Sequence, residues 1–195
     1  NDDLLSNTTQ LAQHIDFLNK SKNNEIVLFD RFLIDKHRLR SATYSSKGRM
    51  SRAVLALYAS VQPKDWEHCD REVLVQNFFF FFYKPNLHHI FPTNSEYVLN
   101  NQYRNKITSD SLMNIAYLTQ ITNLDITNRN PLEYMQDYDK PEFEAIMPSH
   151  LLSSEILDWA RNGTLPDNAI DLFIESRVNN ILSDLKNKLN GVTFD

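Results

Sequence analysis

The sequence predicts an α+β fold, a mainly helical domain with a compact strand–strand–helix finger in its middle. Apolar residues recur at helical spacing towards both ends of the chain, and two short strand-like runs bounded by Pro, Asn and Ser lie between them. Hydrophobic residues make up 42% of the 195 residues, which is enough for a substantial core. Only three residues are glycine, and no Walker or Rossmann phosphate-binding loop can be written, so we expect no nucleotide site in this chain.

The helical segments are expected on both sides of the finger. The N-terminal part predicts one helix over residues 8–20 and another that begins near Ser51 and ends before Pro63, because proline cannot continue a helix. The C-terminal part predicts helices over residues 151–160 and 169–189, the second with a long apolar stripe. We expect the C-terminal helices to pack against the N-terminal ones.

Residues 72–83 contain five consecutive phenylalanines, at positions 78–82. Aromatic content favours a strand, whereas the unbroken apolar length favours a buried helix, and a helix is the preferred interpretation. Five exposed phenylalanines would invite aggregation, so this segment is expected to be covered. Because the first residue is Asn1 rather than Met, we expect the chain to be excised from a longer protein, part of which could supply the cover.

Charge is unevenly distributed, although the net charge is −5. Residues 30–52 carry seven basic side chains against two acidic ones, whereas the chain from Leu132 onward carries twelve acidic side chains against five basic ones. The basic segment predicts contacts with nucleic-acid phosphates, and the acidic part is expected to face away from them. The candidate DNA-binding residues are Arg38, Arg40, Lys47, Arg49 and Arg52. A solvated helix face is the alternative interpretation.

The single cysteine, Cys69, excludes an internal disulfide framework and a cysteine-based zinc ribbon. This usage suits a reducing compartment, and we expect a cytoplasmic protein. No apolar run approaches the length of a membrane span, so no membrane association is expected.

Paired histidines near the middle of the chain carry the candidate chemistry. His88 and His89 lie in a strand expected over residues 86–91, where adjacent side chains point to opposite faces. The two histidines must therefore do different jobs, and one can hold a metal while the other takes a proton from water.

A polar loop is expected over residues 93–110, then a second strand over residues 114–119. Thr122 is the expected N-cap of a helical turn that carries Asn123. In this arrangement Asn123 offers an amide oxygen close to the histidines. Imidazole and oxygen ligands together suit a divalent ion such as Mg²⁺ or Mn²⁺.

These residues resemble the HNH, or ββα-metal, nuclease motif. The motif is carried by His88, by His89-Ile90-Phe91-Pro92, which matches an HxxP signature, by Asn114 and by residues 123–134. More narrowly, the chain resembles the C-terminal nuclease domain of GmrSD-type restriction endonucleases. Those proteins join this domain to a ParB-like NTPase domain and attack modified phage DNA. Residues 173–177 also fit the C-terminal helix of such domains.

The resemblance implies a role for each site residue. His88 would bind the metal and His89 would be the general base. Asn114 would brace the loop between the strands and orient His89, and Asn123 would be the second metal ligand. Arg129 stands where many relatives have Lys, and it would contact a phosphate oxygen or pack on the finger. Asn130 and Pro131 are the expected N-cap and first residue of the next helix.

The expected function is metal-dependent hydrolysis of DNA in a restriction or phage-defence system, with an N-terminal NTPase domain as the partner. The parts are an N-terminal helical part (1–85), the HNH finger (86–138) and an acidic helical part (139–195), together one compact domain. Two alternatives remain open. One is a catalytically inactive HNH-fold module that binds DNA or a partner subunit. The other is a structural interaction domain that docks through its phenylalanine run.

Overall fold

The computed structural model describes part of residues 12–23 and all of residues 35–74, 84–100 and 110–188. The chain forms two compact units, Asn1–Leu33 and Ile34–Asp195. In the first unit, the described residues within the helix expected over 8–20 are helical. The boundaries expected at residues 85 and 138 both fall inside the second unit.

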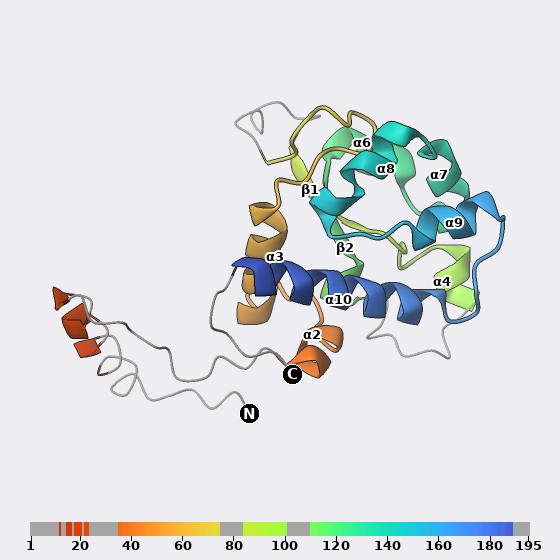
Figure 1. The fold of residues 1–195 in the computed structure, drawn as a ribbon. Helices are drawn as coiled ribbons and strands as arrows, with labels where there is room; N and C mark the ends of the chain where they lie inside the picture. Colours follow the sequence, from red (N-terminus) through yellow and green to blue (C-terminus); the bar gives the residue numbers. More distant parts are fainter. Residues whose placement is uncertain are drawn as a thin grey trace. The chain divides into compact units, whose positions relative to one another are not determined.

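In its described residues the second unit is α+β and mainly helical, with an antiparallel two-stranded sheet (Figure 1). The strands are β1 (Pro85–His89) and β2 (Ile115–Thr119). The helices are α2 (Lys36–Arg40), α3 (Arg49–Ser60), α4 (Glu96–Asn100), α6 (Gln120–Ile126), α7 (Pro131–Asp137), α8 (Pro141–Ile146), α9 (Glu155–Arg161) and α10 (Ala169–Lys188), with 3-10 turns at Leu112–Asn114 and Met147–His150. Within the described ranges, no helix combines the length and apolar character that crossing a bilayer requires.

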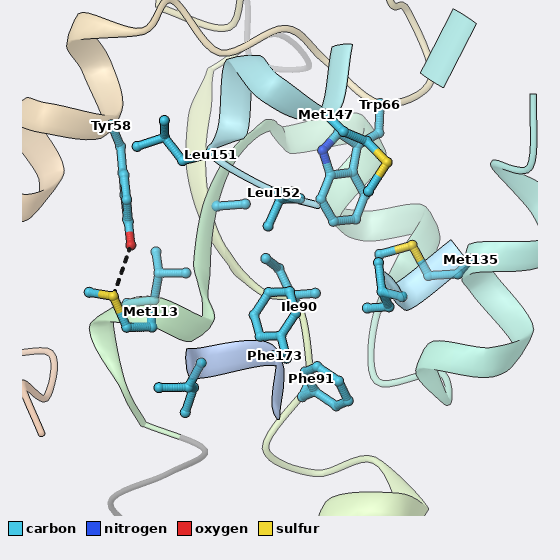
Figure 2. Close-up of a cluster of buried hydrophobic side chains, with 14 of the residues drawn as sticks. Tyr58, Trp66, Ile90, Phe91, Met113, Met135, Met147, Leu151, Leu152 and Phe173 are labelled. Atoms are coloured by element: carbon cyan, nitrogen blue, oxygen red, sulfur yellow. Dashed lines mark hydrogen bonds between the residues drawn. The ribbon is translucent and has the colours of Figure 1, made fainter. Parts of the chain in front are cut away.

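The two strands pair where the sequence predicted them. His88 lies opposite Ala116 and His89 opposite Ile115. Four of the five side chains of β2 are buried, so this strand forms the inner edge of the finger. The core lies between the strands and α10, where the rings of Phe91 and Phe173 are 5.3 Å apart (Figure 2).

The second strand continues directly into α6. Thr119, the last residue of β2, is the N-cap of the helix, and its hydroxyl accepts a hydrogen bond from the Thr122 amide. The expectation that Thr122 would be the cap is wrong, because Thr122 lies inside α6 and its own hydroxyl donates to Asp65 at 2.6 Å. Asn123 therefore lies within the helix instead of at its start.

Three other local expectations need correction. The polar loop expected over residues 93–110 contains α4, where the Ser95 side chain accepts from the Val98 amide. The helix expected from residue 151 begins at Glu155, because Leu151 has a left-handed backbone (φ 55°) that ends the preceding 3-10 turn. Of the helix expected over residues 72–83, only 72–74 are described, and they form a bridge and a turn; residues 75–83, with the phenylalanine run, lie outside the described residues.

The start of α7 agrees with the sequence. Asn130 is its N-cap, with Oδ1 accepting from the Leu132 amide at 3.0 Å, and Pro131 is its first residue. We expect Asn130→Ala to lower the free energy of unfolding by about 1 kcal/mol, because one helical amide loses its acceptor. Urea denaturation followed by circular dichroism measures the change. An unchanged denaturation midpoint would show that the cap adds nothing.

Candidate functional site

A cleft of about 290 Å³ lies between β1, the residues after it, and α6. Three of the expected site residues, His88, His89 and Asn123, line this cleft. The remaining lining residues are Leu87, Pro92, Thr93, Leu124, Thr127 and Asn128. Neither Asn114 nor Arg129 lines it, so neither is placed there to touch a ligand directly.

His88 and Asn123 meet across this cleft. The Nδ1 atom of His88 is 2.9 Å from Oδ1 of Asn123. In the structure this contact is a hydrogen bond in which Nδ1–H of His88 donates to the amide oxygen. Burial lowers the pKa of His88 to about 4, so the imidazole is neutral at physiological pH, and Nδ1 can bind a metal once its proton has moved to Nε2. Adjacent ligands on one divalent ion, each about 2.1 Å from it, are about 3 Å apart. The spacing of these two atoms therefore fits two neighbouring ligands of one ion.

Two aromatic rings pack against the imidazole of His88. The rings of Trp66 and Tyr134 lie edge-to-face with it, at centroid distances of 5.7 and 6.0 Å. In the part of the chain that the structure describes, the buried Nε2 atom of His88 has no hydrogen-bond partner. If a metal occupied Nδ1, the proton would lie on Nε2, among rings that are weak acceptors. The rings thus fix the plane of the imidazole without competing for Nδ1.

His89 has a different environment from its neighbour. It is half-buried and lines the cleft, whereas only 3% of His88 is exposed. Burial lowers the pKa of His89, and the nearby Asp110 partly offsets this shift. A neutral imidazole beside a cleft can accept a proton from water, which is what a general base requires.

Asn114 is fully buried and braces the chain just after β1. Its Oδ1 accepts from the Phe91 amide at 2.8 Å, and its Nδ2 donates to the Phe91 carbonyl at 3.0 Å. Its own carbonyl accepts from the Ile90 amide at 2.8 Å. These three bonds fix the two residues that follow His89. This geometry agrees with the bracing role that the resemblance implies.

Arg129 lies in the turn between α6 and α7. Its guanidinium forms an ion pair with Asp137 of α7, at 2.7 Å. The side chain does not line the cleft. Of the two roles expected for it, packing on the finger fits this geometry better than contact with a phosphate at the site.

The basic segment is partly neutralised by the acidic C-terminal part. Lys36 and Arg40 of α2 both pair with Glu175 of α10, and Arg40 also approaches Asp171 at 3.6 Å. In Figure 1, α2 and α10 lie towards the bottom of the unit and α6 towards the top, and no residue of α2 lines the cleft. The acidic helix therefore lies against this basic helix.

The other candidate DNA-binding residues do not line the cleft. Lys47 and Arg49 are exposed, and Arg52 donates to the Lys47 carbonyl at 2.9 Å. Arg38 is exposed on α2. DNA binding by these five residues stays a prediction.

Several residues that shape the site were missed by sequence reasoning. The buried carboxylate of Asp65 accepts from the Thr119 amide at 2.9 Å and from the Thr122 hydroxyl, and so fixes the start of α6. The adjacent Trp66 packs against His88. No periodicity marks these two residues, and only their contacts with segments more than 20 residues away reveal their role.

Comparisons of the chain with protein-family models, curated proteins and solved structures found no match. Among the described residues, no three His, Cys, Asp or Glu side chains gather as a metal-binding group. The candidate metal ligands are one imidazole, that of His88, and one amide, that of Asn123.

Proposed function

We propose that this chain is a metal-dependent DNA endonuclease that uses a one-metal HNH mechanism. The observation that carries the proposal is the 2.9 Å approach of His88 Nδ1 to Asn123 Oδ1 in a cleft that His89 also lines. The order of elements, an antiparallel strand pair followed directly by a helix, supports the ββα-metal interpretation.

The proposed mechanism assigns a separate task to each side chain. His88 and Asn123 would hold a divalent ion, Mg²⁺ or Mn²⁺, which would supply positive charge to offset the negative charge that develops on the phosphate. His89 takes the proton from the attacking water, and its lowered pKa keeps it unprotonated for this step. Asn114 holds the backbone after β1, so that His89 stays directed at the cleft.

The biological setting is part of the proposal. The resemblance to GmrSD-type nuclease domains supports a restriction or phage-defence role in the cytoplasm, with modified phage DNA as a substrate and an NTPase domain as the partner. The pairing of α2 with α10 reduces the basic charge available on α2. Arg38, Lys47, Arg49 and Arg52 remain exposed, and phosphate contacts by these residues are part of the proposal.

Replacing Asn123 tests the metal site. We expect Asn123→Ala to weaken Mn²⁺ binding at least tenfold, because one of two protein ligands is lost. In a Trp159→Phe background, Trp66 is the remaining tryptophan and lies beside His88, so quenching of its fluorescence reports Mn²⁺ at the site. Nicking of supercoiled plasmid should fall at limiting Mn²⁺ and recover partly at high Mn²⁺.

Asn162→Ala is the matched control, since Asn162 is an exposed asparagine at the end of α9. It should leave both Mn²⁺ binding and nicking unchanged. Wild-type protein that binds DNA but nicks no plasmid with any divalent ion would overturn the nuclease proposal in favour of a binding module. Loss of DNA binding even at low salt would favour a structural role.

A further inference from the structure

Arg177 of α10 is a buried cation whose hydrogen bonds go to main-chain carbonyls. Only 1% of the residue is exposed. Its Nη1 donates to the carbonyls of Met113 and Ile115, both at 2.6 Å, and its Nη2 donates to the carbonyl of His150 at 3.0 Å. The guanidinium also lies 4.3 Å from the centre of the Tyr58 ring. Within the described residues, no carboxylate pairs with it.

Arg177 and Tyr58 together hold the turn that carries Asn114. The Tyr58 hydroxyl donates to the Leu112 carbonyl at 3.0 Å, and Arg177 takes the carbonyls of Met113 and Ile115. The carbonyl between them, that of Asn114, accepts from the Ile90 amide. Every carbonyl from Leu112 to Ile115 therefore has a donor, and all of these donors, on Tyr58, Arg177 and Ile90, lie outside the turn.

This turn connects Arg177 to the candidate base through two routes. Ile115, whose carbonyl Arg177 binds, is the partner of His89 in the sheet. Asn114 lies between the two residues whose carbonyls bind Arg177. Its side chain forms hydrogen bonds with both the amide and the carbonyl of Phe91. A shift of the turn would thus move the residues on either side of His89.

A charged residue at this position needs a physical reason. Burying a guanidinium is unfavourable unless its donors are satisfied, and a hydrophobic residue of similar size would avoid that penalty. Nη1 and Nη2 of Arg177 have acceptors, whereas its buried Nε has no hydrogen-bond partner among the described residues. The planar fork of arginine can reach carbonyls of two chain segments at once, which lysine cannot do with the same geometry. The bonding pattern is therefore suited to fixing the position of the turn relative to α10.

We propose that Arg177 is a positioning residue for the proposed nuclease reaction, holding the Leu112–Ile115 turn so that Asn114 keeps His89 directed at the cleft. This inference depends on the proposed function for its catalytic consequence. The positional part stands on the hydrogen bonds alone and can be tested without any nuclease activity.

Arg177→Lys keeps the charge but removes the fork, and it tests the proposal with two independent readouts. In NMR spectra, the side-chain amide signals of Asn114 should shift, and their hydrogen exchange should accelerate at least tenfold. In plasmid nicking, kcat should fall at least tenfold while KM for DNA and the Kd for Mn²⁺ change less than twofold. The metal affinity is preserved because Asn123 lies on α6, whose start is held by Asp65.

Arg161→Lys is the matched control, since Arg161 pairs with surface carboxylates, and it should change neither readout. If wild-type protein does not nick DNA, the nuclease proposal fails but the Asn114 signals still decide the positional role. A folded Arg177→Lys protein with wild-type Asn114 signals would overturn that role. Should Arg177→Lys not fold, Tyr58→Phe decides instead, since it removes the hydroxyl that donates to the Leu112 carbonyl and contacts the Met113 Sδ in the same turn: shifted Asn114 signals support the proposal and unchanged ones overturn it.

Discussion

Replacing His89 with alanine should slow plasmid nicking by roughly 10²–10⁴-fold, the range that general-base catalysis contributes. The variant keeps His88 and Asn123, so Mn²⁺ should still quench Trp66 with near wild-type affinity. The rate should be measured in single-turnover experiments at saturating Mn²⁺, where a change in metal affinity cannot influence it. Loss of nicking rate with preserved Mn²⁺ affinity would show that His89 acts in catalysis and is not a metal ligand.

The pH dependence of the nicking rate provides a second test of His89 as the general base. Because burial lowers the pKa of His89, the wild-type rate should hold to a pH below the usual histidine range and then fall as the imidazole is protonated. The residual rate of His89→Ala should lack this fall. His37→Ala, at an exposed histidine of α2, is the control and should behave as wild type. Full nicking by His89→Ala would remove His89 from the mechanism.

The local part of the site could be predicted from the sequence. Alternation along a strand predicted different environments for His88 and His89, and the structure buries the first and leaves the second half-buried, although both line the same cleft. The cap pattern of Asn130 and Pro131 was also readable, because it depends on neighbouring residues alone. In each case the information lies within a few positions of the residue concerned.

The residues that support the candidate site from distant parts of the chain could not be predicted from local sequence patterns. Asp65 contacts Thr119 and Thr122 from 54 and 57 positions away, and Arg177 contacts Met113 and Ile115 from 64 and 62. Neither contact leaves a periodic mark in the sequence. The pairing of α2 with α10 was missed for the same reason, since a count of charges does not say which segments meet.

Two buried side chains, those of Arg177 and Asp65, bind the opposite ends of one strand. At the start of β2, Arg177 donates a hydrogen bond to the carbonyl of Ile115. At the end of β2, Asp65 accepts a hydrogen bond from the amide of Thr119. A guanidinium can only donate and an ionised carboxylate can only accept, so each suits the group that it holds. The finger that carries the candidate site is therefore fixed by distant side chains at both ends of its inner strand.

Acidification should destabilise the fold strongly, because two histidines are buried in the neutral form. Burial lowers the pKa of both His88 and His150 to about 4. Each is protonated more readily in the unfolded chain, so the stability contributed by each is complete above the unfolded pKa of about 6.5 and is lost as the pH falls towards 4. At pH 4.5 the loss is about 2 to 3 kcal/mol for each histidine, a large share of the 5–15 kcal/mol typical of a domain.

Urea denaturation in EDTA between pH 7.5 and pH 4.5 measures this loss, and His150→Gln assigns it. The Nε2 atom of His150 lies 2.6 Å from the Lys64 carbonyl, and a glutamine amide can donate to that carbonyl without titrating. This variant should therefore lose about half of the wild-type pH dependence, while His37→Gln, at an exposed position, should lose none. If His150→Gln kept the full dependence, the acid sensitivity would have to arise from His88 or from the carboxylates, and His150 would have no part in it.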